Sequence, residues 1–396
     1  MYYTFCILHK VYYICIKYFI MKTKDNPFYL RGYHGAYLFC DRKEETKQLI
    51  DNVNNGINTT LISIRRMGKT GLIHHTFNSL SKDKNVICIY IDIYATQNLS
   101  EFTNQLASII LKSFPKTKRI GKEFMNMIKG FAPVFSYDPF TGLPNVSLSF
   151  TQTNQPEHSL KSLFSFLEKQ NKKIVIAFDE FQQITEYPEK NVEHILRTLI
   201  QPLKNCSFIF SGSQKHILLE MFSSAKRPFF SSTQFLFLSN IEAHEYSKFI
   251  KKVFVKHQRT ITDEAIDFIL NWTKRHTYYT QALCNKVYAQ SIKNIDIESV
   301  YFACDGILKE QENIFYQYRN LLTKLQWNLL KAIAKEDKVT QPTGINFISK
   351  NNLGNASSVR RSLMSLIEKE MVFEMSTKEQ SYYSVYNCFL SRWLER

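Results

Sequence analysis

One short segment limits what this chain can fold into more than any other: a Gly-Lys-Thr turn between a strand-like stretch and a helix-like stretch. The β-branched run 59–64 predicts a short strand, and the periodicity of residues 72–80 predicts a helix. The segment Arg65-Arg66-Met67-Gly68-Lys69-Thr70 stands between them. A tight loop at a helix N-terminus can surround a phosphate with backbone N–H groups. The segment therefore predicts a phosphate-binding loop in an α/β fold.

This loop supplies most of the candidate nucleotide-binding residues. We expect Lys69 to reach the β- and γ-phosphates of a nucleotide, and the Thr70 hydroxyl to hold Mg²⁺. Ser63 stands where such loops usually begin with glycine, so the loop must accommodate a Cβ there. A Gly-Lys-Thr turn also arises by chance at helix starts, which is the alternative. The candidate set is Ser63, Ile64, Arg65, Arg66, Met67, Gly68, Lys69, Thr70 and Gly71.

A second motif lies about 110 residues further along the chain. The apolar run 174–178 predicts a parallel strand buried on both faces, and Asp179 and Glu180 follow it directly. Ligands of α/β sheets bind at the carboxyl ends of the strands. We expect Asp179 to position Mg²⁺ through water and Glu180 to polarise the attacking water; the alternative is a strand end with two solvated acids. Together the two motifs predict a bound nucleotide with Mg²⁺.

Three more apolar runs fit strands of the same sheet. They cover residues 86–93, 206–210 and 234–238. Ser213 or Gln214, just beyond the second of these runs, can sense the γ-phosphate and orient water, although a plain turn explains them nearly as well. The segment 99–114 predicts a helix. The segment 131–153 is rich in Phe, Pro and Gly, which indicates an inserted hairpin or loop.

From Glu242 onward the periodicity becomes helical, and the end of the chain changes again. Helices are predicted over 242–255, 262–273 and 278–292, and then over 321–335, 344–352 and 359–370. Residues 355–358 cap the last of these helices. Two alternating runs, 371–375 and 382–386, then predict a hairpin around Thr377-Lys378-Glu379. Three helices and a hairpin indicate a winged helix, whose third helix can enter a DNA major groove.

These motifs together resemble the archaeal-type ATPase family, P-loop NTPases of the AAA/STAND lineage with a C-terminal winged helix. The resemblance rests on Asn26-Pro27-Phe28, Phe39-Cys40-Asp41-Arg42 with Glu45, Arg65 to Thr70, Phe178-Asp179-Glu180-Phe181, Arg227-Pro228-Phe229 and Val385-Tyr386-Asn387. It implies a five-stranded parallel sheet flanked by helices with the phosphate strand central, then a helical lid and a winged helix. It also implies ATP hydrolysis with Mg²⁺, and it adds Arg42 to the nucleotide-binding candidates.

The expected parts are a non-functional or mis-started extension (1–20), an ATPase core (21–240), a helical lid (241–320) and a winged helix (321–396). The nucleotide state is expected to reposition the winged helix. The alternatives are a DNA-binding regulator that binds ATP with little turnover, and a signalling switch whose partner is a protein.

The resemblance also implies an arginine where this chain has Ser232. An arginine that stabilises the charge on a transferring phosphoryl group is worth about 10³–10⁵ in rate. Lys226 or Arg227 can substitute, and Pro228 biases Arg227 to an extended conformation that projects its side chain. We expect Arg227 to act on a neighbouring subunit, so that self-association speeds turnover; the alternative is a surface arginine with no catalytic part.

The charge balance leaves the partner open. The chain has 51 Lys and Arg against 35 Asp and Glu, a net charge of +16, which invites a polyanion such as DNA. A Lys-rich, Gly-poor composition is also what AT-rich coding produces. The winged-helix segment itself has only 11 basic against 7 acidic residues. DNA contact through the winged helix and a protein partner are therefore both retained.

Two further features bear on location. The eight cysteines are scattered without a CxxC pair, which argues against a structural zinc site and suits a reducing compartment. The apolar stretch 1–20 is short for a membrane span and is interrupted by His9, Lys10 and Lys17. We expect Met21 to be the functional start, with an aromatic surface anchor as the alternative, and we expect a cytoplasmic protein without a membrane partner.

Overall fold

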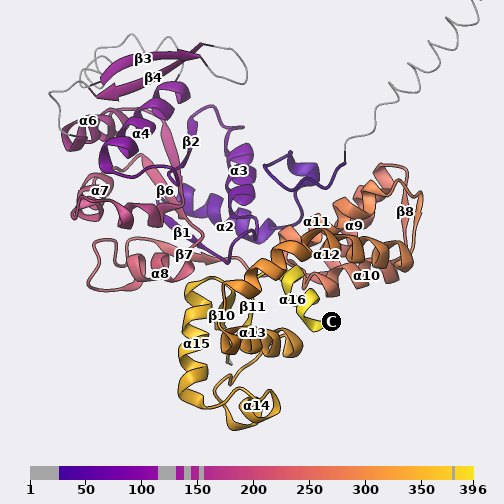
Figure 1. The fold of residues 1–396 in the computed structure, drawn as a ribbon. Helices are drawn as coiled ribbons and strands as arrows, with labels where there is room; N and C mark the ends of the chain where they lie inside the picture. The colour runs from indigo at the N-terminus through magenta and orange to yellow at the C-terminus, as the bar shows by residue number, and fades with distance from the viewer. Residues whose placement is uncertain (1–25, 115–130, 138–143, 151–155, 377–379) are drawn as a thin grey trace, which may run out of the picture. The chain divides into compact units, whose positions relative to one another are not determined.

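The computed structural model describes residues 26–114, 131–137, 144–150, 156–376 and 380–396, with the side chains of 131–150 and of Ser376 excepted. The chain forms two compact units (Figure 1). The sheet unit comprises Gly32–Asn240, and the helical unit comprises residues 26–31 with Ile241–Arg396. The expected features of residues 1–20 and of the turn 377–379 lie outside the described residues.

The sheet unit is built on five parallel strands in the order β2-β5-β6-β1-β7. The strands are β1 (Thr59–Ile62), β2 (Val86–Asp92), β5 (Lys173–Asp179), β6 (Cys206–Ser211) and β7 (Gln234–Phe237). All five strands predicted from apolar runs are present. The strand that precedes the Gly-Lys-Thr loop was expected at the centre of the sheet, but β6 is the central strand, and β1 lies beside it, between β6 and β7. The predicted α/β fold is therefore confirmed.

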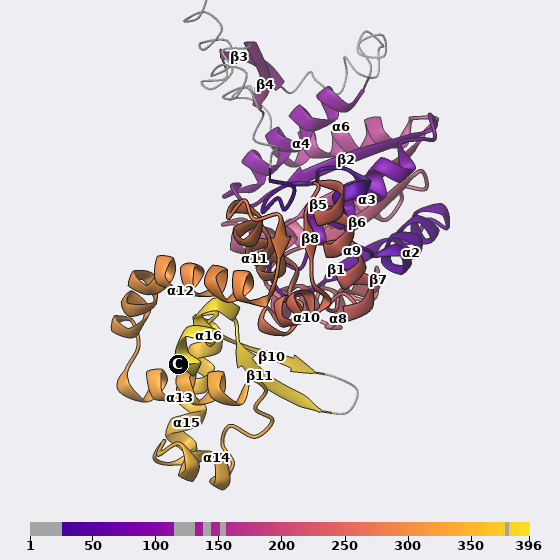
Figure 2. The ribbon, with the colours of Figure 1, turned by 90° about the vertical axis from the view of Figure 1, so that its right-hand side faces the viewer.

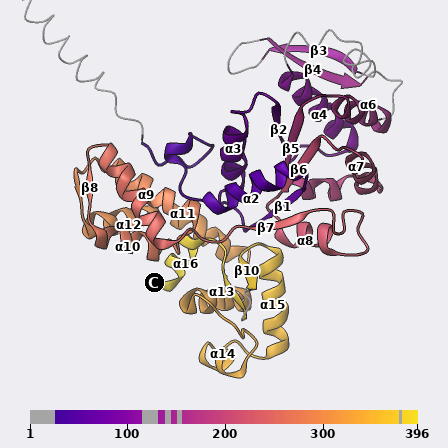
Figure 3. The same cartoon turned by 180° about the vertical axis from the view of Figure 1, so that it is seen from behind.

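Helices cover both faces of this sheet (Figures 1 and 3). On one face pack α2 (Lys43–Asn54) and α3 (Lys69–Leu80), which bury side chains such as Leu72 and Phe77 against the strands. On the other face pack α4 (Leu99–Ser113), α6 (Pro156–Glu168), α7 (Val192–Ile200) and α8 (Lys215–Ser223). Short 3-10 turns lie at Ala36–Leu38 (η1) and Phe181–Glu186 (η3).

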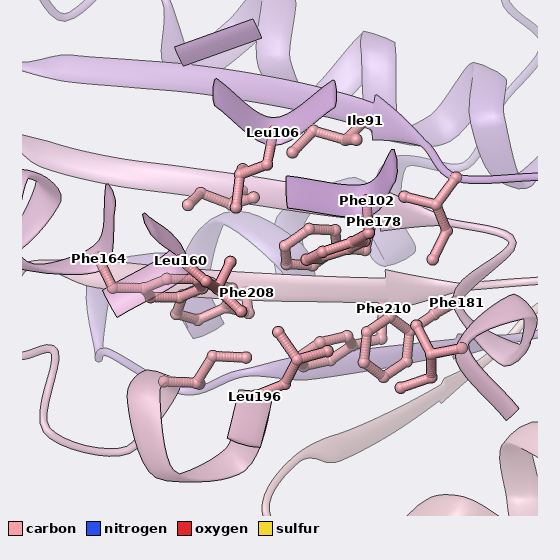
Figure 4. Packing of buried hydrophobic residues seen from close by; sticks show 14 of the residues in the cluster. Ile91, Phe102, Leu106, Leu160, Phe164, Phe178, Phe181, Leu196, Phe208 and Phe210 are labelled. Carbon is pink, nitrogen blue, oxygen red and sulfur yellow. The ribbon is translucent and has the colours of Figure 1, made fainter. Parts of the chain in front are cut away.

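The alternation of side chains along each strand decides which core each residue joins. In β5, Ile174, Ile176 and Phe178 face the core under α4 and α7, whereas Val175 and Ala177 face α3. Figure 4 shows Phe178 beside Phe208 and Phe210, with ring centroids 6.2 and 6.0 Å from that of Phe178. By the same alternation Asp179, at the end of β5, belongs to the α3 face. The carboxylate at the end of β5 therefore lies on the same face of the sheet as α3, which follows the phosphate loop.

The predicted insertion is a hairpin. Its strands β3 (Phe131–Tyr137) and β4 (Pro144–Phe150) pair antiparallel. This agrees with the hairpin expected within 131–153.

The helical unit begins with four helices. They are α9 (Ala243–Lys256), α10 (Asp263–Trp272), α11 (Thr277–Ala289) and α12 (Ile297–Asn320), with a two-strand ladder of β8 (Thr260–Ile261) and β9 (Asn294–Ile295). The long α12 was not predicted, although Asp296 caps it by accepting from the Ser299 amide. Phe28 is buried against Phe254, and Asn285 donates to the Phe28 carbonyl. Residues 26–31 therefore pack with the helical unit although they precede the sheet unit in sequence.

The C-terminal elements form the predicted winged helix (Figure 2). They are α13 (Lys324–Glu336), α14 (Ile345–Lys350), α15 (Ala356–Glu368), β10 (Val372–Ser376), β11 (Ser381–Val385) and α16 (Cys388–Glu395). Asn355 caps α15 as expected, because its side chain accepts from the Ser358 amide. The terminal α16 was not predicted.

The last helix joins the winged helix to the helices before it. Arg392 of α16 donates to the carbonyls of Trp272 (2.8 Å) and Asn271 (2.9 Å) at the end of α10. Phe389 packs on Trp272 with ring centroids 5.5 Å apart. An ion pair between Lys274 and Asp337 adds a charged contact between the same two parts. These contacts make α9–α16 one compact body.

Candidate functional site

The Gly-Lys-Thr loop connects β1 to α3 as predicted. Gly68 precedes the helix with φ 93°, a left-handed conformation that favours glycine. The helix then begins at Lys69, so the amides of Lys69, Thr70 and Gly71 stand in its first turn without partners inside the helix. Gly71 lies against the Phe39 ring, where an added Cβ would meet the ring at 3.5 Å. The loop therefore offers an anion site at a helix N-terminus.

Lys69 is buried in this loop, with 7% of its surface exposed. Its Nζ donates to Ser63 Oγ (3.1 Å) and to the Ile64 carbonyl (3.3 Å). Ser63, the departure from the usual glycine, thus gives the lysine an acceptor inside the loop. Burial lowers the pKa of Lys69 to about 8, while the carboxylates of Asp179 and Glu180 oppose that shift.

Asp179 accepts hydrogen bonds from hydroxyl groups on three other elements. Its Oδ2 accepts from Thr70 Oγ1 (2.7 Å) and from the Tyr90 hydroxyl (2.8 Å), and its Oδ1 accepts from Ser211 Oγ. Tyr90 in β2 and Ser211 in β6 share the α3 face with Asp179. Burial, followed by the charge of Asp179, raises the pKa of Tyr90, so its hydroxyl stays a donor.

The structure thus joins the two predicted motifs directly. A threonine hydroxyl and a carboxylate are hard oxygen ligands, and their 2.7 Å separation fits a shared Mg²⁺ and its bound water. Among the described residues, no group of three or more His, Cys, Asp or Glu side chains could hold a metal. A metal here would draw its remaining ligands from phosphate and water, as Mg²⁺ commonly does.

Glu180 sits beside this pair in a strained backbone conformation. Its φ is 56°, which is unusual for a non-glycine residue and points to a local constraint. Its Oε2 accepts three hydrogen bonds: from Gln182 Nε2 (2.6 Å), from Ser213 Oγ (2.7 Å) and from the Ser213 amide (3.1 Å). Ser213, predicted as a phosphate sensor, therefore lies at the site in contact with the catalytic candidate.

Sequence reasoning missed three residues that contact the two acids: Tyr90, Gln182 and Ser211. Ser211 is the last residue of β6 and stands two residues before Ser213, a predicted site residue, so a signal existed for it. Tyr90 is a tyrosine within the apolar run 86–93, where nothing singled it out, and Gln182 carried no signal. Their role follows from strand order, which brings the ends of β2, β5 and β6 together.

The remaining arginine candidates lie in different settings. Arg42 is buried and donates to Glu45 Oε1 and to the Ser239 carbonyl, both at 2.7 Å. These bonds tie α2 to the end of β7, and contact of Arg42 with nucleotide stays a prediction. In the loop itself, Arg66 is exposed, Arg65 is half-buried and Met67 is buried.

Arg227 follows α8 and pairs with acids of its own unit. Its Nη2 lies 2.7 Å from Glu193 Oε1 and its Nη1 lies 3.8 Å from Glu220 Oε1. Ser232, at the position of the absent arginine, donates to the Phe229 carbonyl at 2.7 Å and closes a turn. The role of Arg227 on a neighbouring subunit stays a prediction.

We expect Arg227→Ala to destabilise the sheet unit. Burial raises the pKa of Glu193, and removing its cation leaves the 14%-exposed carboxylate without this charge partner. The pair is only partly buried, so we expect the free energy of unfolding to fall by about 1–2 kcal/mol, between the values for exposed and buried pairs. Urea unfolding measures it, with Arg227→Lys as the control that keeps the charge. Equal stability of wild type and Arg227→Ala would contradict the structural role.

Comparisons with known proteins agree with this fold. The family model described as "ATPase domain predominantly from Archaea" matches residues 39–274, more than half of the chain. The model described as "probable winged helix domain" matches residues 313–396. No curated protein shows significant similarity to the sequence.

Two solved structures share the fold over nearly the whole chain. The Walker-type ATPase of Pyrococcus abyssi is 16% identical, with a TM-score of 0.66 over 93% of this chain and 100% of that one. The ORC2 protein of Aeropyrum pernix, solved as ADPNP-ADP complexes, is 14% identical, with a TM-score of 0.56 over 94% of this chain and 96% of that one. At these identities the likeness is one of fold.

Proposed function

The chain belongs to the family of ATPase domains found predominantly in Archaea, and from that membership we propose that it binds ATP with Mg²⁺ and hydrolyses it to ADP and phosphate. The observation that carries the proposal is the contact of Thr70 with Asp179 beside Lys69, with Glu180 next in the chain. Lys69 and the first turn of α3 bind the phosphates, and Thr70 and Asp179 hold Mg²⁺. The metal, when bound, neutralises charge on the phosphates. Glu180 takes the proton of the attacking water.

We extend the proposal to a conformational switch. Because α16 and the Lys274–Asp337 pair hold the winged helix against α10, we expect the helical unit to respond to nucleotide as one body. The winged helix would then move together with α9–α12, and would not swing separately about residue 320. Within that body we still propose two domains, a lid (241–320) and a winged helix (321–396).

A DNA-binding regulator with little turnover is the second candidate. The observation that favours it is the surface of α15, where Arg360, Arg361 and Met364 are exposed on the third helix of a winged helix.

Within the described part of the chain, every helix is too short or too polar to span a membrane. A protein partner remains the third candidate.

One experiment separates these candidates: steady-state ATP turnover of the full chain with and without duplex DNA, over a range of protein concentrations. DNA-stimulated turnover supports a DNA-coupled ATPase, and salt-sensitive DNA binding without turnover supports the regulator. ATP turnover that is the same with and without DNA supports a switch with a protein partner. Specific activity that rises with protein concentration, and does so less in Arg227→Lys, supports the action of Arg227 across a self-association interface.

The buried lysine predicts a pH dependence of ATP binding. Lys69 binds phosphate as a cation, and its pKa of about 8 means that the empty site loses this cation as the pH rises. ATP affinity should therefore be level below about pH 8 and then fall about tenfold per pH unit, because binding must restore the proton. Equilibrium binding titrations from about pH 7 to about pH 9.5 measure it. Lys69→Arg is the control, since arginine stays charged over this range. A level wild-type profile would rule out the lowered pKa.

A further inference from the structure

The most unusual arrangement in the site is the crowding of donors on one oxygen of Glu180. Gln182 Nε2 and both donors of Ser213 converge on Oε2, whereas Oε1 accepts no hydrogen bond from the described residues. A carboxylate oxygen with three donors is saturated, which leaves Oε1 as the atom that can face a water. The arrangement therefore leaves Oε1 as the oxygen of Glu180 that can act on a water.

Gln182 is the unexpected member of this set. It lies in η3, directly after the strand end, and only 5% of its surface is exposed. A carboxylate only accepts hydrogen bonds, so the amide must present its nitrogen to Glu180. Its Oε1 is then buried with no hydrogen-bond partner in the described chain. A buried acceptor without a partner costs about 1–3 kcal/mol, so the side chain is held there at the expense of stability.

Gly212 makes the room for this amide. A Cβ at Gly212 would overlap Gln182 Oε1 and would come within 3.0 Å of Leu218 Cδ1. The φ of Gly212 is outside the left-handed region, so its backbone conformation does not require glycine. The segment 211–213 thus serves both acids: Ser211 bonds Asp179, Ser213 bonds Glu180, and Gly212 leaves space for the side chain that bonds Glu180.

We propose that Gln182, seated over Gly212, is a positioning residue that holds the Glu180 carboxylate in the orientation for water activation. The inference rests on the proposed function, in which Glu180 accepts the proton from water. Gln182 contacts neither phosphate nor metal in this scheme; it acts through Glu180. The strained φ of Glu180 agrees with a side chain that is held from several sides.

The activity test uses a size-matched variant and a neighbour as its control. Gln182→Met removes the donor and keeps the length, and we expect kcat to fall about 10–100-fold with the ATP dissociation constant unchanged, the scale expected for a misplaced catalytic group. Gln183 lies next in η3 and donates to the Thr96 carbonyl (3.1 Å), so Gln183→Met should keep the wild-type kcat. Wild-type kcat in Gln182→Met, or an equal loss in both variants, would overturn the inference.

A substitution at Gly212 gives a second, independent test of the inference. Gly212→Ala should lower kcat by displacing the Gln182 amide. In a Gln182→Ala background, where that amide is absent, it should lower kcat little further, because the remaining close contact is with the flexible end of Leu218. A plainly structural role of Gly212 would give losses that multiply. That result would overturn the inference.

A stability cycle keeps the inference separate from the ATPase proposal. Urea unfolding of Glu180→Ala, Gln182→Met and the double variant should show a coupling of about tenfold or more in the unfolding equilibrium constant, as expected for a hydrogen bond to a charged group. The same cycle with Gln183→Met should show none. If the wild type hydrolyses no ATP, the proposed function fails while this coupling still decides whether Gln182 holds Glu180. If the cycle shows no coupling between Glu180 and Gln182, the inference is wrong, whatever ATPase activity is measured.

Discussion

Glu180→Gln is expected to lower the ATP turnover number by about 10²–10⁴-fold, the usual contribution of a general base, while leaving ATP affinity unchanged. The amide oxygen of the variant can still accept from Gln182 and Ser213, so the side chain keeps its place. It cannot take a proton from water at neutral pH. Phosphate release and equilibrium ATP binding measure the two quantities separately.

The matched control is another glutamate of the same segment. Glu186 is exposed in η3, and Glu186→Gln removes the same charge without touching the site. We expect it to turn over ATP like the wild type. Turnover by Glu180→Gln at the wild-type rate would remove Glu180 from the mechanism, and a parallel loss of ATP affinity would make it a binding residue.

Lys69→Ala is expected to weaken ATP binding about 100-fold or more. Charge-assisted hydrogen bonds contribute about 1.5–3 kcal/mol each, and a lysine between two phosphates makes more than one of them. The buried amine also lies 3.1 Å from Ser63 Oγ, so its loss leaves the loop without the group that fills it. Calorimetric titration with ATP and Mg²⁺ measures the affinity.

Thermal unfolding gives an independent measure of the same loss. ATP at 100 times its dissociation constant stabilises a protein by about 2.7 kcal/mol, so the wild type should melt at a higher temperature with ATP. Lys69→Ala should show no such shift at the same ATP concentration. Lys84→Ala, which removes an exposed lysine of the sheet unit, should keep it. Equal shifts in Lys69→Ala and wild type would refute the assignment of the loop.

Much of the fold could be read from local patterns. Buried runs such as 174–178 predict strands because both faces of a parallel sheet are covered, and Asn355 predicts the start of α15 because its side chain can cap the first turn. The unpredicted helices are α6, α7 and α8 in the sheet unit and α12 and α16 in the helical unit, and each of them packs on other elements of its unit. Their apolar positions make sense only against those neighbours.

By itself, the sequence determined the strand–loop–helix at Lys69, the acids at the end of β5 and the winged helix, because each is a continuous stretch whose pattern carries its own conformation. Only the tertiary structure decided the partners of those acids. Tyr90 pairs in register with Ala177, which places its ring on the α3 face beside Asp179, and the order β5-β6 brings Ser213 to Glu180. Strand order and register arise from the packing of the whole sheet, and a hydrogen bond between side chains far apart in the chain exists only once that packing is complete.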